Sequence, residues 1–338
     1  MPPPGNDLLQ NNKGMALLTA LVVLFVLTTL SFLFYHSVFA SYAISRSFAD
    51  NIALRNLSLS GVYLAVATLA EDRHQSFNDT LQENWALLGK KKSVFSEKET
   101  ATSLHIVDLK SRLSVDALLN RNGSGSNPEY AALFYHLLNN PPFELDTQNA
   151  ARIVAALVDW QDNNDGEAVT SFRGQLGAES SYYESLSPPI VCRNKPIESL
   201  DQLLAIRGIT KELLYGEKDK PGLAEFIAVT PAGLDIDPTI NINTAPREIL
   251  RAVFANAPPA SIDEMIAYRD DYPFQLEKKN WYSTFISSAA SPRPGLIQIR
   301  SDLFEITAAA AKGPMKTEIT TTVWREPNRF TFSSWRQR

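Results

Sequence analysis

The strongest pattern along the chain is a predominantly apolar run from residue 15 to residue 35, which contains no charged residue, Gly or Pro. An α-helix rises about 1.5 Å per residue, so roughly 20 apolar residues cross a hydrocarbon core about 30 Å thick. The run therefore predicts a membrane-spanning helix. Its length and its abrupt boundary with the polar residues before it are not typical of a cleaved secretory signal peptide.

The helix is expected to continue beyond the membrane. Residues 36–72 keep helix-forming residues, and apolar residues recur there mostly at helical spacings. Charges appear at Arg46, Asp50 and Arg55, where a face exposed to water should begin. Gly61 is tolerated at some cost to helix stability. We therefore predict one continuous helix, with a span followed by a separate helix as the alternative.

After this helix the pattern changes three times. Residues 74–102 are polar and should form a loop, and residues 104–109 have the apolar positions of a strand. Mostly helical spacings follow from about residue 116 to 275, and strands return after Pro294. The expected helices cover residues 130–138, 150–160, 199–205, 211–215, 246–256 and 261–269; the later strands cover 296–300, 303–310 and 316–323, with a turn at Gly313-Pro314 and a last edge strand near Phe330 to Trp335.

These elements predict an α+β fold, in which a long N-terminal transmembrane and stem helix packs on an antiparallel sheet interrupted by a large helical inserted domain. The predicted boundaries are 1–14 for a leader, 15–72 for the helix, 73–115 for the first part of the sheet, 116–290 for the insert and 291–338 for the last strands. Asp146 or Asn149 should cap the helix at 150–160, and Asn243 or Thr244 the helix that begins at Pro246.

Composition narrows the function. The 338 residues are 44% hydrophobic and 10% aromatic, which is enough for packed cores. A net charge of −5 argues against nucleic acid as the main partner. Cys192 is the single cysteine, so no intrachain disulfide can form, and it should be a small buried or half-buried residue. The four His residues are scattered, and no Gly-x-Ser-x-Gly, His-Glu-x-x-His or P-loop is present, so we predict no enzyme.

Carboxylates are densest between residues 159 and 184. The stretch reads Asp159-Trp-Gln-Asp162-Asn-Asn164-Asp165-Gly-Glu167 and continues after a gap with Gly177-Ala-Glu179-Ser-Ser-Tyr182-Tyr183-Glu184. Hard oxygen ligands at short spacing around a Gly turn suit Ca²⁺, which takes six to eight oxygens. The stretch is not an EF-hand, because with Gly166 as the loop Gly the twelfth residue is Phe172. From spacing alone, a solvated polar loop and a Ca²⁺ site both remain open.

Two stretches, residues 203–209 and 240–250, resemble helix-hairpin-helix motifs, whose Gly turn presents backbone N–H groups to phosphate. A DNA-binding copy normally adds Lys or Arg around the turn. Here acidic residues flank Arg207 and Lys211, which favours a structural hairpin. A membrane-anchored DNA-uptake receptor that uses these motifs, or a membrane-bound enzyme, is the alternative function.

The residues before the apolar run resemble the leader of type IV pilins and pseudopilins. The polar leader ends in Lys13-Gly14, so the small residue lies before the apolar segment and not after it. By this resemblance a prepilin peptidase would cleave after Gly14, and Met15 would become the methylated first residue. Most of these proteins carry Glu as the fifth mature residue, whereas this chain has Thr19, whose hydroxyl can bond back to its own helix.

Segments along most of the chain resemble the K-type minor pseudopilin family of type II secretion, which lacks that Glu. They are the carboxylate stretch, Ser185-Leu-Ser-Pro-Pro, Ile197-Glu-Ser-Leu-Asp-Gln-Leu, Asn241-Ile-Asn-Thr-Ala-Pro and Ser301-Asp-Leu-Phe-Glu-Ile. The resemblance implies a pilin-like fold and a place at the tip of the pseudopilus with the I- and J-type minor pseudopilins. There the protein would prime filament assembly and help export proteins through the outer membrane.

The resemblance also implies a single-pass protein of the inner membrane with its C-terminal domain in the periplasm. It implies Ca²⁺ binding in the insert, with Asp159, Asp162, Asn164 and Glu179 on the family's pattern. Asn164 and Ser180 replace Asp residues of that pattern, and Asp165 and Glu167 are the candidate substitutes.

Overall fold

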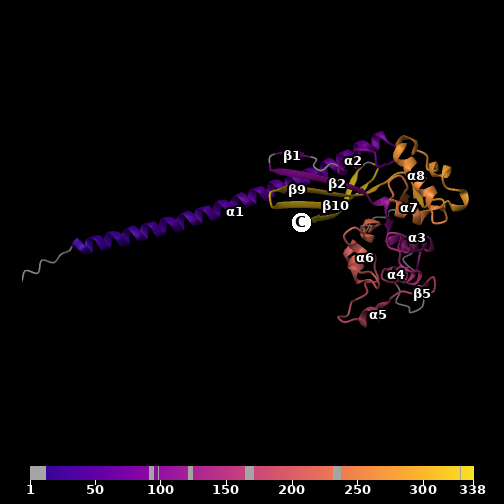
Figure 1. Ribbon diagram of the computed structural model, residues 1–338, viewed down its shortest axis with the longest axis horizontal. Helices are drawn as coiled ribbons and strands as arrows, with labels where there is room; N and C mark the ends of the chain where they lie inside the picture. The colour runs from indigo at the N-terminus through magenta and orange to yellow at the C-terminus, as the bar shows by residue number, and fades with distance from the viewer. Residues whose placement is uncertain are drawn as a thin grey trace, which may run out of the picture. The chain divides into compact units, whose positions relative to one another are not determined.

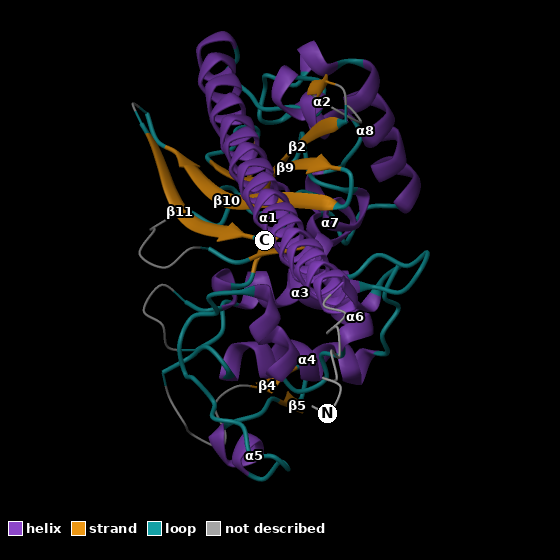
Figure 2. Ribbon diagram, turned by 90° about the vertical axis from the view of Figure 1, so that its left-hand side faces the viewer, coloured by secondary structure: helices purple, strands orange, loops and turns teal. Residues whose placement is uncertain are grey.

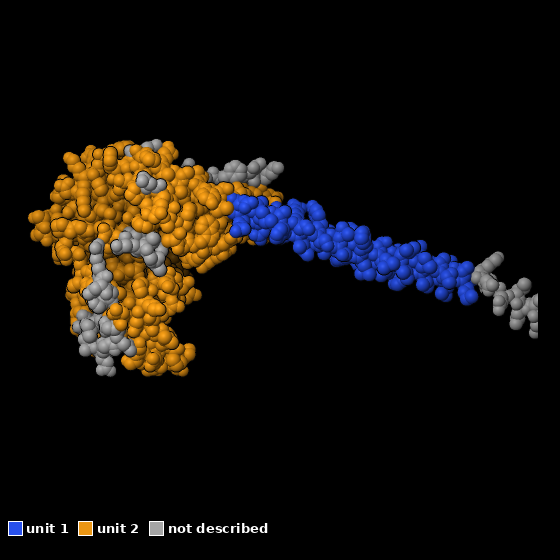
Figure 3. Space-filling model, turned by 180° about the vertical axis from the view of Figure 1, so that it is seen from behind, with its two compact units in different colours: residues 1–56 blue, residues 57–338 orange. Residues whose placement is uncertain are grey.

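The computed structural model describes residues 13–90, 95–97, 99–120, 125–163, 171–230, 237–327 and 329–338. The chain divides into two compact units, residues 1–56 and residues 57–338 (Figure 3). The described part of the first unit is the N-terminal portion of helix α1 (Lys13–Gln75), which is helical without a break. This unbroken helix confirms the prediction of a continuous stem. In the described part of the chain, α1 is also the one helix long and apolar enough to cross a membrane.

The second unit contains a five-stranded antiparallel sheet with the spatial order β1-β2-β9-β10-β11 (Figures 1 and 2). The strands are β1 (Phe95–Glu97), β2 (Thr100–Asp108), β9 (Leu303–Lys312), β10 (Met315–Arg325) and β11 (Phe330–Gln337). In the middle of the sheet, Leu104 of β2 lies opposite Ala308 of β9. The sheet therefore joins strands from the two ends of this unit, and the residues between them form an insert, which confirms the predicted α+β fold.

One face of the sheet packs against the second half of α1. Val62, Ala65 and Leu69 of α1 are buried in one core with β-strand residues that include Ile306 and Val323. A Cβ placed on Gly61 would lie 3.0 Å from the Cβ of Ala308. Gly61 therefore lets the helix approach the sheet more closely than a larger residue would, which explains a glycine inside a helix.

Helix α2 (Asn84–Lys90) lies in the stretch predicted to be a loop, so this part of the prediction is wrong. The helix has two turns, which is too short for a helical period to be recognised. It forms because Trp85 is buried, with its ring 5.4 Å from and edge-on to the ring of Phe304 on β9. Tertiary packing, more than local preference, stabilises this helix.

The longer regular elements of the insert are helices (Figure 1). The insert has a core of its own, distinct from the core under α1. Cys192 is buried in this core, as predicted. The α-helices are α3 (Pro128–Asn139), α4 (Thr147–Asp159), α5 (Ser180–Glu184), α6 (Lys211–Tyr215), α7 (Arg247–Val253) and α8 (Pro259–Asp271). Short 3₁₀ helices lie at Leu109–Ser111, Asp116–Leu118, Leu200–Ala205, Leu223–Glu225, Pro273–Gln275, Trp281–Thr284 and Ser288–Ala290. Short strands are β3 (Leu113–Ser114), β4 (Ser171–Phe172), β5 (Gln175–Leu176), β6 (Ile227–Ala228), β7 (Ile240–Asn241) and β8 (Ile297–Gln298).

Two local predictions in this region are wrong and one is confirmed. Asp146 accepts hydrogen bonds from the first backbone N–H groups of α4, as predicted for a cap. Neither Asn243 nor Thr244 caps α7, because the residue before that helix is Pro246 and both side chains bind elsewhere. Strand β8, predicted as part of the C-terminal meander, pairs instead with β7 in a parallel two-stranded ladder.

Candidate functional site

The predicted cleavage position lies at the start of α1. Gly14 and Met15 are in the first turn of the described helix, and the Met15 side chain is 69% exposed. No atom lies within 4 Å of a Cβ placed on Gly14, so packing within the chain does not require a small residue at this position. Residues 1–12, which make up most of the predicted leader, lie outside the described residues.

Thr19 satisfies its hydroxyl within its own helix, as predicted. Its Oγ1 donates to the carbonyl oxygens of Met15 at 3.1 Å and Ala16 at 2.9 Å. A carboxylate at this position would need a partner to be stable in a bilayer, whereas this hydroxyl is satisfied locally. The apolar helix therefore carries no anion at the position where most pilins have one.

The predicted metal ligands that the structure describes lie around the C-terminal end of α4. Asp159 is the last residue of this helix, and both it and Asp162 are fully buried. Glu179 is half-buried and directly precedes α5. Asn164 and Glu167 lie outside the described residues.

Gly177 brings the two halves of this carboxylate region together. A Cβ placed on Gly177 would clash with Oδ2 of Asp159 and would lie 2.7 Å from the backbone of Ala155. Only a residue without a side chain can therefore pass this close to the end of α4. The sequence spacing alone could not establish that Asp159 contacts the segment that leads to Glu179.

Aromatic rings and a cation enclose the same region. The rings of Trp160 and Tyr183 meet edge-on at 4.9 Å, and burial raises the pKa of Tyr183 well above its usual value. Tyr183 Oη accepts a hydrogen bond from the backbone N–H of Arg207 at 3.3 Å. The Arg207 guanidinium donates to the carbonyl oxygen of Gly177 at 3.1 Å and lies 4.7 Å from the ring centre of Tyr182.

These contacts give the first helix-hairpin-helix stretch a role within the fold. The Arg207 side chain is engaged by the chain itself, and the next residue, Gly208, has φ +87°. A Cβ on Gly208 would lie 2.8 Å from Cγ1 of Ile153 on α4. The hairpin turn therefore packs against α4 and supports the carboxylate region, in agreement with its interpretation as a structural hairpin.

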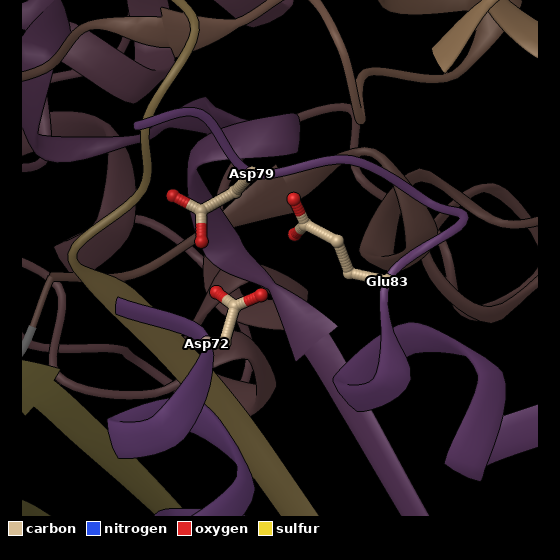
Figure 4. Close-up of side chains that lie close together, drawn as sticks. All are labelled: Asp72, Asp79 and Glu83. Carbon is tan, nitrogen blue, oxygen red and sulfur yellow. The ribbon is translucent and has the colours of Figure 1, made fainter. Parts of the chain in front are cut away.

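A second group of carboxylates was not anticipated from the sequence. Asp72, at the end of α1, and Asp79 and Glu83, in the following loop, point toward one another, and their oxygens approach within 4.8 Å (Figure 4). Arg325, at the end of β10, places Nη2 2.5 and 2.6 Å from the two oxygens of Asp79 and Nη1 3.2 Å from Asp72. Sequence spacing could not reveal this group, because Arg325 lies more than 240 positions from both aspartates.

The same group continues into the insert through Asp108, at the end of β2. Its Oδ2 accepts hydrogen bonds from Thr244 Oγ1 at 2.5 Å, Ser301 Oγ at 2.6 Å and Asn241 Nδ2 at 3.3 Å. Asp79 accepts the backbone N–H of Ser301 at 2.6 Å. The Asn-Ile-Asn-Thr-Ala-Pro and Ser-Asp-Leu-Phe segments therefore meet at this buried network.

Comparison with known proteins shows similarity to one component of a secretion system. A family model described as type II secretion system (T2SS), protein K, matches residues 111–218. Type II secretion system protein K of Klebsiella pneumoniae is 28% identical over 204 residues, which cover 60% of this chain and 59% of that protein. The protein of the same name from Aeromonas hydrophila is 24% identical over 323 residues, 90% of this chain and 91% of that protein. The chain is therefore similar to type II secretion system protein K over most of its length.

A solved structure agrees in fold with this similarity to protein K. The crystal structure of the GspK-GspI-GspJ complex from the type 2 secretion system of enterotoxigenic Escherichia coli contains a chain that matches with a TM-score of 0.63. The match has 16% sequence identity and covers 87% of this chain and 99% of that one. The protein K family is a structural component of the secretion system, and its model spans the carboxylate region and Arg207 of this chain.

Proposed function

We propose that this chain belongs to the protein K family and is a minor pseudopilin at the tip of the type II secretion pseudopilus. There it primes filament assembly and aids the export of proteins through the outer membrane, by assembly and not by catalysis. The observation that carries the proposal is an apolar membrane segment without an anion: Thr19 takes the position of the usual Glu and bonds to its own helix. A subunit without that anion offers nothing to the N-terminal amine of a further subunit, which suits a terminal position.

The partners and location follow from the same assignment. The matched structure is named as a complex of GspK with GspI and GspJ, so we propose I- and J-type minor pseudopilins as partners of this chain. The single apolar helix fits an anchor in the inner membrane, with the C-terminal domain in the periplasm. A prepilin peptidase would cleave between Gly14 and Met15 and methylate the new N-terminus.

Co-purification tests the tip role. The full-length protein, extracted from membranes in mild detergent, should recover both the I- and J-type partners when all three are co-expressed. A single-pass membrane protein unrelated to pilins serves as the control for recovery through detergent alone. Failure to recover either partner would contradict the proposal.

Replacement of Gly14 tests the processing step separately. Gly14→Leu should leave the leader attached and give a slower band on a gel, because the peptidase requires a small residue before the cut. Met15→Leu changes the neighbouring residue to another apolar one and should be processed normally. Equal migration of Gly14→Leu and the wild type would show that no cleavage occurs at this position.

We also propose that the carboxylate region binds Ca²⁺ through Asp159, Asp162 and Glu179, with Asn164 and Glu167 as the remaining candidates. Oxygen ligands match the preference of Ca²⁺, and Gly177 lets the two ligand-bearing segments meet.

Ca²⁺ should raise the melting temperature of the full-length protein in detergent, and EDTA should reverse the effect. Asp159→Asn should reduce the Ca²⁺ response, whereas the exposed control Asp219→Asn should retain it. Absence of any Ca²⁺ heat by calorimetry would refute this assignment.

A further inference from the structure

The inserted domain meets the stem and sheet at a buried polar joint. The insert and the α1–sheet body have separate apolar cores, and a small cluster of Leu109, Ala228 and Leu303 lies apart from both. The polar network comes from all the segments that meet here: the end of α1, the loop after it, the end of β2, the β7–α7 segment, the residues before β9 and the end of β10. Its members are Asp72, Asp79, Glu83, Asp108, Asn241, Thr244, Ser301 and Arg325.

The charges of this network do not balance. It contains four carboxylates, of Asp72, Asp79, Glu83 and Asp108, but one guanidinium, of Arg325. Asp72, Asp79, Asp108 and Arg325 are each less than 10% exposed, and Glu83 is half-buried. Ionised carboxylates in excess of their cations are costly away from water.

The neighbouring cations make their hydrogen bonds and ion pairs outside the network, although Arg73 is also close enough to Asp79 to interact with its charge. Arg73 donates to the carbonyl oxygens of Arg325 and Glu326. Lys110 lies 3.4 Å from Asp302 and donates to the carbonyl oxygen of Asp237. Arg300 lies near Arg73, and Arg112 lies near enough to Asp108 to interact with its charge but also interacts with Glu305 and Glu225. A proton is the simplest means of removing the excess negative charge.

Burial favours the protonated carboxyl groups. Burial, with repulsion from Glu83 and Asp79 and only partly offset by Arg325, raises the pKa of Asp72 to about 8. Burial also raises the pKa of Glu83, although hydrogen bonds from Thr80 and Trp85 oppose it. Burial raises the pKa of Asp108 to about 6 against the hydrogen bonds from Ser301 and Thr244.

We propose that this network is a proton-dependent joint, which fastens the inserted domain to the stem–sheet body while the Asp72–Glu83 pair holds a proton, and which loosens when that proton is lost. This inference is independent of the proposed tip function. The proton binds the closed joint more tightly than the open one, because in the open joint the carboxyl of Asp72 is hydrated and has its ordinary pKa near 4. The free energy of opening therefore falls as the pH rises from about 4 to about 8, and then levels off.

Hydrogen exchange on the full-length protein in detergent tests the joint. The informative backbone amides are those of Lys110, Asn243 and Ser301, each of which donates to a side chain of the network. After correction for intrinsic exchange, their protection should fall roughly tenfold or more between pH 6 and pH 8. Amides in the β9–β10 ladder, away from the network, should show no such fall.

Asp72→Asn is the decisive variant, because the amide keeps the shape and the acceptor for Arg325 but cannot ionise. It should remove most of the pH dependence, whereas the exposed control Asp219→Asn should behave like the wild type. Glu83→Gln, which removes the other member of the pair, should also flatten the pH profile. A wild type without the fall, or an equal fall in Asp72→Asn and Glu83→Gln, would overturn the proposal. Loss of protection on adding EDTA at pH 6 would show that a metal ion, and not a proton, neutralises the site.

Discussion

At the scale of single residues, Arg325 contacts several segments that are distant in the sequence. Its guanidinium contacts Asp72 and the carbonyl oxygen of Leu69 on α1, Asp79 in the loop and the carbonyl oxygen of Ser301. It also lies 4.8 Å from the ring centre of Phe304. One cation thus binds segments that come together only in the folded chain, and it partly compensates carboxylates that would otherwise repel one another.

Loss of this cation should destabilise the protein strongly. Arg325→Gln should lower the free energy of unfolding by about 3–5 kcal/mol, because it leaves buried carboxylates without their counter-charge. Urea denaturation of the detergent-solubilised protein provides the measurement. Arg329→Gln is the matched control, because the guanidinium of the Arg329–Glu326 pair is exposed and its loss should change the stability little. Similar losses in the two variants would be inconsistent with a central role for Arg325.

Gly177 is a residue whose identity is determined by packing, because its backbone lies close to Asp159 and Ala155. Gly177→Ala should destabilise the insert by about 1–3 kcal/mol, because its Cβ cannot fit beside Asp159 and the backbone of Ala155. The same change should weaken Ca²⁺ binding in calorimetry if the two segments together form the site. Gly174, another glycine of this region, has φ +75° but no atom near its Cβ position, so Gly174→Asn provides a control that tolerates the turn. Unchanged stability of Gly177→Ala would contradict the packing described.

At the scale of elements, long periodic patterns in the sequence are sufficient to predict helices and strands. Short elements, and elements stabilised by residues far away in the sequence, cannot be predicted in this way. The apolar run and the helical spacings after it predict α1, and alternating or β-branched residues predict β9 and β10, because each element is long enough for its own pattern to be recognised. Aromatic residues predict β11. Trp85 gave no such pattern for α2, whose stability depends on Phe304 more than 200 positions away. Thr244 looked like a helix cap, but its hydroxyl binds Asp108, a contact that no local rule could reveal.

The candidate sites also differ in how far the sequence alone could predict them. The composition of the 159–184 stretch identified Asp159, Asp162 and Glu179 as candidate ligands, but the role of Gly177 required the structure. The Asp72–Asp79–Glu83 group was missed because polar residues at the end of a stem and in the loop after it ordinarily face water. Their burial depends on residues near positions 301 and 325, so it becomes visible only after the sheet is assembled.

The packing of α1 on the sheet should depend on Gly61. Gly61→Leu should lower the free energy of unfolding by about 1–3 kcal/mol, because the larger side chain would push α1 away from Ala308. The measurement is thermal or urea unfolding followed by circular dichroism. Ala67→Leu, on the exposed side of α1, is the control and should change the stability little. A neutral Gly61→Leu would mean that the helix and the sheet are not in close contact.

At the scale of the whole second unit, two apolar cores share one polar joint. Each core buries enough large side chains to form a cooperative unit, while the joint depends on directed hydrogen bonds. Asn241 reaches three members of the joint from the insert, since its Nδ2 donates to Asp108, Ser301 and the carbonyl oxygen of Asp79.

Removal of Asn241 should therefore separate the unfolding of the two cores. Asn241→Ala should convert a single calorimetric transition into two, because it cuts bonds across the joint and leaves both apolar cores intact. Asn139→Ala, which removes a hydrogen bond within the insert, should lower the transition temperature without splitting it. One undivided transition in Asn241→Ala would indicate that apolar contacts, and not this network, couple the two parts.

The pairing of β2 with β9 has a consequence for biosynthesis. Ala308, the neighbour of Leu104 across the ladder, is synthesised about 200 residues after Leu104. The insert, whose buried residues run from Leu113 to Ile297, is complete before β9 is made and can condense first. During that interval β2 has no central neighbour, so a newly made chain that stalls before residue 303 would expose an unpaired strand and attract chaperones or proteases.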